Sequence, residues 1–132
     1  MKAVDRTGIE VIDSDECLRL LRGRRVGRVG IVVGGEPLIL PVNYAVVDET
    51  IVFRSAPGSK LDMGPRAPAC FEVDEFDESM STGWSVLVAG RLEEIDAGEA
   101  GDAEVTPWAP GDREHWMRLV PRRVTGRRVA PA

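Results

Sequence analysis

Residues 26–55 read VGRVGIVVGGEPLILPVNYAVVDETIVFRS, and this stretch decides the fold. Three segments within it have the apolar patterning of β-strands: 26–33, 38–47 and 50–55. Gly34-Gly35 is a hairpin signal between the first two, and Asp48-Glu49 turns the chain before the third. Three consecutive antiparallel strands form a meander, and a meander this twisted commonly closes into a barrel.

The flanking sequence predicts one helix and further strands. Ser14 is the expected N-cap of a short helix with two acids in its first turn, and Gly23 is the expected C′ residue. Additional strands are expected at 69–76, at 84–95 and in the run that leads from His115 to Val129. Because residues 84–95 are almost continuously apolar up to Gly90, we expect that strand to be central and covered on both faces.

Two segments are expected to lie outside the regular structure. Residues 74–78 are mostly acidic and predict a solvated loop rather than a metal site. Residues 96–112 are rich in Gly, Ala, Pro and acids and predict a mobile loop or an irregular helix, with Trp108 docked on its own chain or on a partner. Pro41 interrupts the second strand of the meander, at a position where a central strand tolerates proline poorly.

The 132 residues suit a single domain, 1–132, with residues 1–13 as an N-terminal arm. A net charge of −5 argues against broad binding of nucleic acids or anionic membranes. The sequence has no apolar run of the roughly 20 residues that span a bilayer. Cys17 and Cys70 are too few for a disulfide framework, so we expect a cytoplasmic protein with reduced cysteines.

The segment from Val52 to Leu61, VFRSAPGSKL, has the composition of an anion site. Arg54 and Ser55 end a strand, and Lys60 opens a short helix after the Pro57-Gly58 turn. A guanidinium, a hydroxyl, an ammonium and free amides at a helix start together suit a phosphate group. An ordinary solvated turn explains the same residues equally well, so this segment alone leaves both interpretations open.

Elimination points to a bound cofactor if the chain is an enzyme. His115 is the single histidine, which gives little support to a Ser/His site or a His-rich metal centre. No carboxylate pair stands out, and the glycines of residues 26–35 are not followed by the helix that a dinucleotide fingerprint requires. A cofactor would then supply the reactive group, and the protein would bind and orient it.

Several motifs in order along the chain resemble one family: a short N-terminal helix, GRRVGRVG at 23–30, LPVNY at 40–44, FRS at 53–55 with KL at 60–61, and GWSV at 83–86. This is the pyridoxamine 5′-phosphate oxidase-like, flavin-binding split β-barrel family, in its short actinobacterial-type branch. The similarity extends from about Ser14 to Val129.

The resemblance implies a mainly β protein: a six-stranded antiparallel split β-barrel with a short N-terminal helix and small connecting helices. It also implies a homodimer with two FMN sites at the subunit interface. Arg54, Ser55 and Lys60 match the phosphate-binding positions, and Pro41, Val42 and Asn43 match the strand along the flavin ring. Trp84 and Ser85 match a position that reaches the partner's cofactor; Leu61 and Tyr44 are weaker candidates.

The leading hypothesis is an FMN-binding oxidoreductase that acts on an unidentified small molecule, with no side chain assigned as acid or base. The C-terminal signature of the true oxidase, a Trp followed by an Arg-Leu-His segment, is absent; residues 116–122 read WMRLVPR. One alternative is a deazaflavin-dependent reductase, whose acidic cofactor tail would use further cations such as Arg24, Arg25 and Arg127. The other is a non-catalytic flavin- or haem-binding protein. Barrel or dimer packing is the competing role for Trp84.

Overall fold

The computed structural model describes residues 3–55, 67–109, 111 and 115–129. Lys60 and Leu61 lie outside the described residues, as does the short connecting helix expected just after Gly58.

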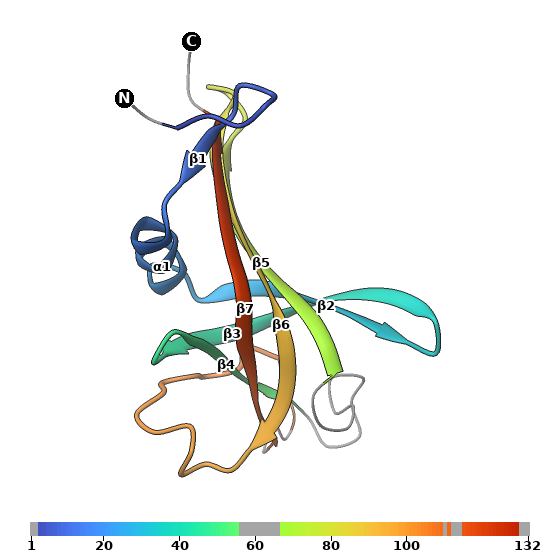
Figure 1. The fold of residues 1–132 in the computed structure, drawn as a ribbon. Helices are drawn as coiled ribbons and strands as arrows, with labels where there is room; N and C mark the ends of the chain where they lie inside the picture. The colour runs from blue at the N-terminus through green and yellow to red at the C-terminus, as the bar shows by residue number, and fades with distance from the viewer. Residues whose placement is uncertain (1–2, 56–66, 110, 112–114, 130–132) are drawn as a thin grey trace.

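Strands make up most of the described chain. The elements in order are β1 (Glu10–Ile12), α1 (Ser14–Arg22), β2 (Val26–Val33), β3 (Glu36–Val47), β4 (Thr50–Ser55), β5 (Ala67–Asp77), β6 (Thr82–Ile95) and β7 (His115–Val129). All pairings are antiparallel, in the order β1-β7-β4-β3-β2-β5-β6, and β6 also pairs with β7. Strands β2 to β7 therefore close into a ring, and the predicted six-stranded split barrel is confirmed (Figure 1).

The core fills the inside of this ring, and α1 covers one side of it. The largest buried side chains include Phe53, Phe71, Leu21, Leu92 and Leu119. The helix contributes Cys17 and Leu21 to the same cluster. The Tyr44 hydroxyl donates to the Leu21 carbonyl at 2.5 Å, and the Tyr44 ring meets Phe71 edge-on at 4.8 Å. Tyr44 is thus a core residue that fastens the helix to β3.

At a bulge, strand β7 switches from odd-numbered to even-numbered residues facing the core. The register with β6 shifts between Ala89 and Gly90, so Ala89 pairs with Arg123 and Gly90 with Pro121. N-terminal to the shift, Met117 and Leu119 pack toward the core; C-terminal to it, Val124 does so. One extra residue in a strand reverses which side chains face inward, and this is what the bulge does here.

The helix prediction was correct in extent but wrong at both caps. Asp13, not Ser14, is the N-cap, and its carboxylate accepts a hydrogen bond from the Glu16 backbone N–H at 2.9 Å. Ser14 is the first helical residue. Gly23 is the C-cap itself, with right-handed backbone angles (φ −83°, ψ −2°), rather than a left-handed C′ residue.

The acidic segment 74–78 is mostly strand, which corrects the predicted loop. Strand β5 continues through Asp77. Two arginines, one in β2 and one just before it, hold the carboxylates of β5: Arg24 lies 2.9 Å from Glu75, and Arg28 lies 3.0 Å from Glu72 and 3.3 Å from Asp74. These cross-strand ion pairs offset the like-charge repulsion that otherwise disfavours consecutive acids in a strand.

Strand β6 is buried on one face only, so the expectation that both faces are covered was wrong for this chain by itself. Val86 and Val88 are buried, whereas Leu87 is 41% exposed. Leu87 belongs to an outward surface, here called the outer face, on which Pro41, Arg28, Glu72 and Leu87 lie opposite one another on β3, β2, β5 and β6. Pro41 is tolerated because the ladder from β3 to β4 begins only at Tyr44 among the described residues.

No helix among the described residues has the length and apolar character needed to cross a membrane.

The charged cluster on the outer face makes a prediction about pH. Burial and the neighbouring Asp74 carboxyl raise the pKa of Glu72 to about 7 from an ordinary 4.5, although Arg28 opposes the shift. Because the folded chain holds this proton more tightly than the unfolded chain does, the contribution of Glu72 to stability falls as pH rises from 4.5 to about 7. Glu72→Gln should therefore match wild type near pH 4 and exceed it at pH 8 by about 1 kcal/mol once solvent screening is allowed for.

Urea denaturation of the cofactor-free protein across this pH range measures the difference. Asp74→Asn, which removes the neighbouring negative charge, should shift the pH-dependent step to lower pH rather than abolish it. If Glu72→Gln and wild type keep a constant difference at all pH values, the assignment to Glu72 is wrong.

Candidate functional site

Arg54 and Ser55 end β4 with their side chains on opposite faces. Ser55 follows Ile51 and Phe53 on the core side and is 1% exposed. Its hydroxyl has no hydrogen-bond partner among the described residues. Arg54 follows Val52 on the outer side and lies opposite Trp116 in the ladder with β7. The two residues therefore flank the end of the strand from both sides, and a buried hydroxyl without a partner needs an explanation.

The Arg54 side chain is held between β7 and the segment 96–109, here called the covering segment. Its guanidinium carbon lies 5.0 Å from the centre of the Trp116 ring. Its NH1 nitrogen lies 3.5 Å from the Val105 carbonyl oxygen, at the outer limit of a hydrogen bond. Ala100 and Val105 of the covering segment are buried, and Ala100 packs with Val52 in a small second core to which Trp116 also belongs.

Asn43 lies one position beyond the Tyr44–Phe53 pair on β3, as Arg54 does on β4. The Asn43 Oδ1 atom accepts a hydrogen bond from the Trp108 backbone N–H at 2.8 Å, and its Nδ2 donates to the Arg25 carbonyl at 3.4 Å. An amide has a second N–H and a second lone pair, so each end keeps the capacity for one further bond. The covering segment thus contacts both Arg54 and Asn43.

The other residues predicted to bind the cofactor, on β3 and β6, divide between the two faces of the sheet. Pro41 is exposed on the outer face, whereas Val42 packs against the core. Ser85 lies opposite Asp74 and Arg127, on the outer face, and two strands separate it from Asn43. At about 4.8 Å per strand, Ser85 is roughly 14 Å across the sheet from Asn43. Within one chain, therefore, the structure does not bring these two residues into contact.

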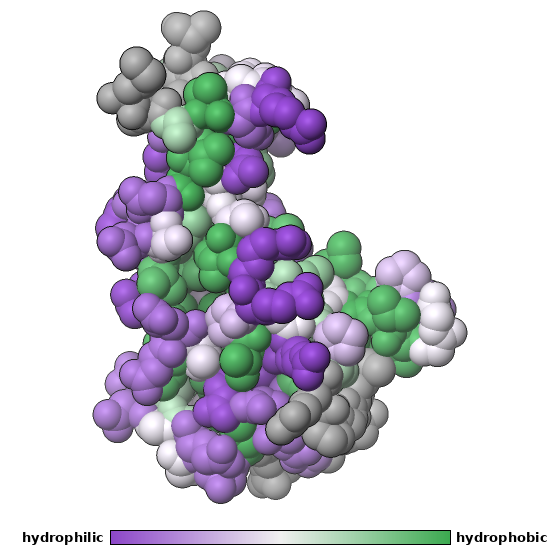
Figure 2. Space-filling model, in the orientation of Figure 1, coloured by the Kyte–Doolittle hydropathy of each residue, from purple (hydrophilic) through white to green (hydrophobic). Residues whose placement is uncertain are grey.

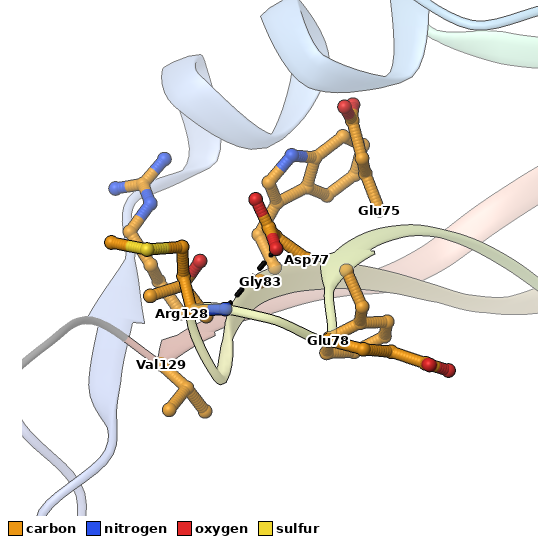
Figure 3. Close-up of a pocket in the computed structure, with 10 residues that line it drawn as sticks. Glu75, Asp77, Glu78, Gly83, Arg128 and Val129 are labelled. Atoms are coloured by element: carbon orange, nitrogen blue, oxygen red, sulfur yellow. Dashed lines mark hydrogen bonds between the residues drawn. The ribbon is translucent and has the colours of Figure 1, made fainter.

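Trp84 packs partly against the core and lines an open groove of about 780 Å³ at the β5–β6 turn. Figure 3 shows Glu75, Asp77 and Gly83 of the hairpin near Arg128 and Val129 at the end of β7. Arg128 is held by Glu10 at 3.1 Å and Glu16 at 3.4 Å. This groove lies at the opposite end of β7 from Trp116, so it is separate from the Arg54 end.

Sequence reasoning did not single out Trp116 or Val105 as part of the Arg54 site. Trp116 is 62 positions from Arg54, and only the register of β4 with β7 brings them together. Among the described residues no three His, Cys, Asp or Glu side chains are grouped so as to hold a metal ion. The site therefore consists of cationic, hydroxyl and amide groups at one end of the barrel.

Comparison with known proteins agrees with this architecture. The family model described as pyridoxamine 5′-phosphate oxidase matches residues 13–128. The chain belongs to this family.

Three relatives show how the similarity is distributed. An FAD-binding protein from Mycobacterium smegmatis is 33% identical, with a TM-score of 0.79, and the match covers 92% of this chain and 99% of that one. An FAD-binding protein from Mesorhizobium loti is 26% identical, with a TM-score of 0.72 and coverage of 91% and 96%. An uncharacterized protein of Mycobacterium tuberculosis is 32% identical over 127 residues, 89% of this chain and 84% of the relative.

The buried Ser55 hydroxyl leads to a prediction for Ser55→Ala in which stability and cofactor binding respond in opposite directions. Without cofactor, Ser55→Ala should leave stability unchanged or raise it by up to about 1 kcal/mol, because a buried polar group without a partner is removed. If Ser55 holds a phosphate oxygen, the same change should weaken flavin mononucleotide binding by roughly 1.5–3 kcal/mol, the range for hydrogen bonds to charged groups. Thermal melting and a fluorescence titration measure the two effects. A loss of stability without any loss of binding would mean that Ser55 serves only the core.

Proposed function

We propose that this protein is an FMN-binding oxidoreductase that acts on a small molecule. The observation that carries the proposal comes from the end of β4 in a member of this family. There the buried Ser55 hydroxyl has no partner among the described residues, and the Arg54 guanidinium lies on the opposite face of the strand. When bound, a flavin accepts and delivers hydride at its N5 atom.

The residues of the chain bind and orient the cofactor in this proposal. Arg54 and Ser55 reach a phosphate beyond the end of β4 from its two sides, and Lys60 adds a point charge. Pro41 and Asn43 lie along the ring edge, where the remaining N–H and lone pair of Asn43 serve polar atoms of the flavin. Val42 supports this strand from the core side.

Charge pairing favours a flavin over a deazaflavin with a long acidic tail. Such a tail needs cations beyond Arg54 and Lys60, and Arg24, Arg25 and Arg127 were the arginines expected to supply them. Two of these three are engaged by carboxylates: Arg24 is paired with Glu75 at 2.9 Å and Arg127 with Asp5 at 3.1 Å. The FAD-binding relatives support a flavin and make FAD the main competitor of FMN.

We further propose that a second copy of the chain covers the outer face. Four large hydrophobic residues are exposed on it: Val26 (39%), Val32 (58%), Ile39 (73%) and Leu87 (41%). Figure 2 shows hydrophobic surface over the projecting β2–β3 hairpin, which carries Val32 and Ile39. A patch of this kind is typical of an interaction site. Since Pro41, Asn43 and Ser85 adjoin it, a partner laid there would place its own Ser85 near the cofactor.

The cofactor assignment is tested by titrating stripped protein with FMN, FAD and a deazaflavin. We expect the tightest binding for FMN, and Arg54→Ala and Lys60→Ala should each weaken it by roughly 1.5–3 kcal/mol. Arg22→Ala, at the exposed end of α1, is the matched control and should leave the affinity unchanged. Unchanged affinity in both site variants would remove the phosphate assignment. Tighter binding of FAD or the deazaflavin would replace FMN, and binding without turnover by any electron donor would favour a carrier.

The second copy is tested by sedimentation at micromolar concentration, where we expect a dimer. Ile39→Lys and Leu87→Lys place charges on the outer face and should raise the dissociation constant at least about tenfold, since a buried unpaired charge is costly. Val120→Lys is the control, because Val120 is similarly exposed (40%) but adjoins the charged groups of Arg122, Arg123 and Asp48. A wild-type monomer that still binds flavin would contradict the shared site.

A further inference from the structure

We infer that Trp116 is a positioning residue for the cofactor phosphate: its indole holds the Arg54 guanidinium in the orientation that binds the anion. This inference rests on the proposed function and adds a residue that is not among the expected cofactor ligands. The observation behind it is the position of the Arg54 guanidinium carbon over the Trp116 ring, 5.0 Å from the ring centre.

Neighbouring strands and a small apolar core hold the Trp116 indole in place. Trp116 lies directly opposite Arg54 in the β4–β7 ladder and opposite Ile95 in the β6–β7 ladder. It also packs with the second core of Val52, Ile95 and Ala100. Two ladders and one apolar cluster therefore determine where the ring lies, and its face is a rigid surface for a flat cation.

The covering segment limits the guanidinium from a second direction. The Val105 carbonyl lies 3.5 Å from NH1, and Val105 is only 6% exposed. An arginine side chain loses rotamer freedom when it binds in one geometry, and this loss opposes binding. Stacking on the indole removes part of this loss before the phosphate arrives, which is how preorganisation raises affinity. Because the indole acts through Arg54 on the phosphate alone, its effect should depend on the phosphate.

This dependence separates positioning from ordinary packing. FMN carries a phosphate and riboflavin does not, so the ratio of their dissociation constants reports the phosphate contacts alone. Trp116→Leu should weaken FMN binding about three- to tenfold, the range expected from cation–π energies. Riboflavin binding should be unchanged, and Trp116→Phe, which keeps a smaller aromatic face, should fall between wild type and Trp116→Leu.

A double-mutant cycle assigns the effect to Arg54. In an Arg54→Ala background, Trp116→Leu should cause no further loss of FMN affinity. Ile95→Val is the packing control: it trims the same small core while keeping the indole, and should leave the FMN to riboflavin ratio unchanged. In the cofactor-free protein, the ring current of Trp116 should shift the Arg54 Nε–H resonance upfield, and Trp116→Leu should abolish that shift.

The outcomes separate this inference from the proposed function. Equal weakening of FMN and riboflavin by Trp116→Leu, or an additive loss in the double variant, would assign the indole to packing only. If Arg54→Ala weakens FMN binding and Trp116→Leu does not, the phosphate site stands and the positioning role is wrong. If wild type binds FMN no better than riboflavin, the phosphate site and the positioning role both fail. Should Trp116→Leu not fold, the Trp116→Phe ratio and its Arg54 resonance decide.

Discussion

The close approach of Gly90 to the Val120 carbonyl is the constraint on which the rest of the structure depends. A Cβ at Gly90 would lie 2.0 Å from that oxygen, so only glycine fits. This contact lies at the bulge where the register of β6 and β7 shifts by one. On one side of the bulge β7 also pairs with β4, and on the other it also pairs with β1. One strand thereby closes the barrel and carries the N-terminal arm.

The alternation of side chains between the two faces of each strand then determines how the candidate site is assembled. Neighbours in sequence are sent to opposite faces, so Arg54 meets the covering segment while Ser55 enters the core. Residues distant in sequence are brought together instead: Arg54 with Trp116 by the β4–β7 ladder, and Asn43 with Trp108 by a hydrogen bond from the Trp108 backbone N–H to the Asn43 side-chain oxygen. The covering segment 96–109 is therefore part of the wall of the site, and its own residues Ala100 and Val105 are buried against the barrel.

Much of the fold could be predicted from local sequence. Alternation and turn residues placed strands at 26–33 and 50–55, which the structure confirms, and Gly34 and Gly35 have the positive φ that their hairpin requires. The errors arose where non-local pairing overrides local preference. Residues 74–77 looked like a loop because acids disfavour strands, but arginines from β2 and beside it neutralise them. The exposure of Leu87 depends on which elements cover β6, and composition does not encode that.

The candidate site was less predictable because one extra residue in β7 decides which of its side chains face the core. Met117 and Leu119 face the core only because the bulge adds one residue between them and Val124. Without that residue the alternation would run unbroken from Val124, and Trp116 would face the core with Arg118, leaving Met117 outward. The Arg54 guanidinium would then lose its aromatic partner although neither residue had changed. A motif records which residues are present, whereas the geometry around Arg54 follows from Gly90, a residue of another strand.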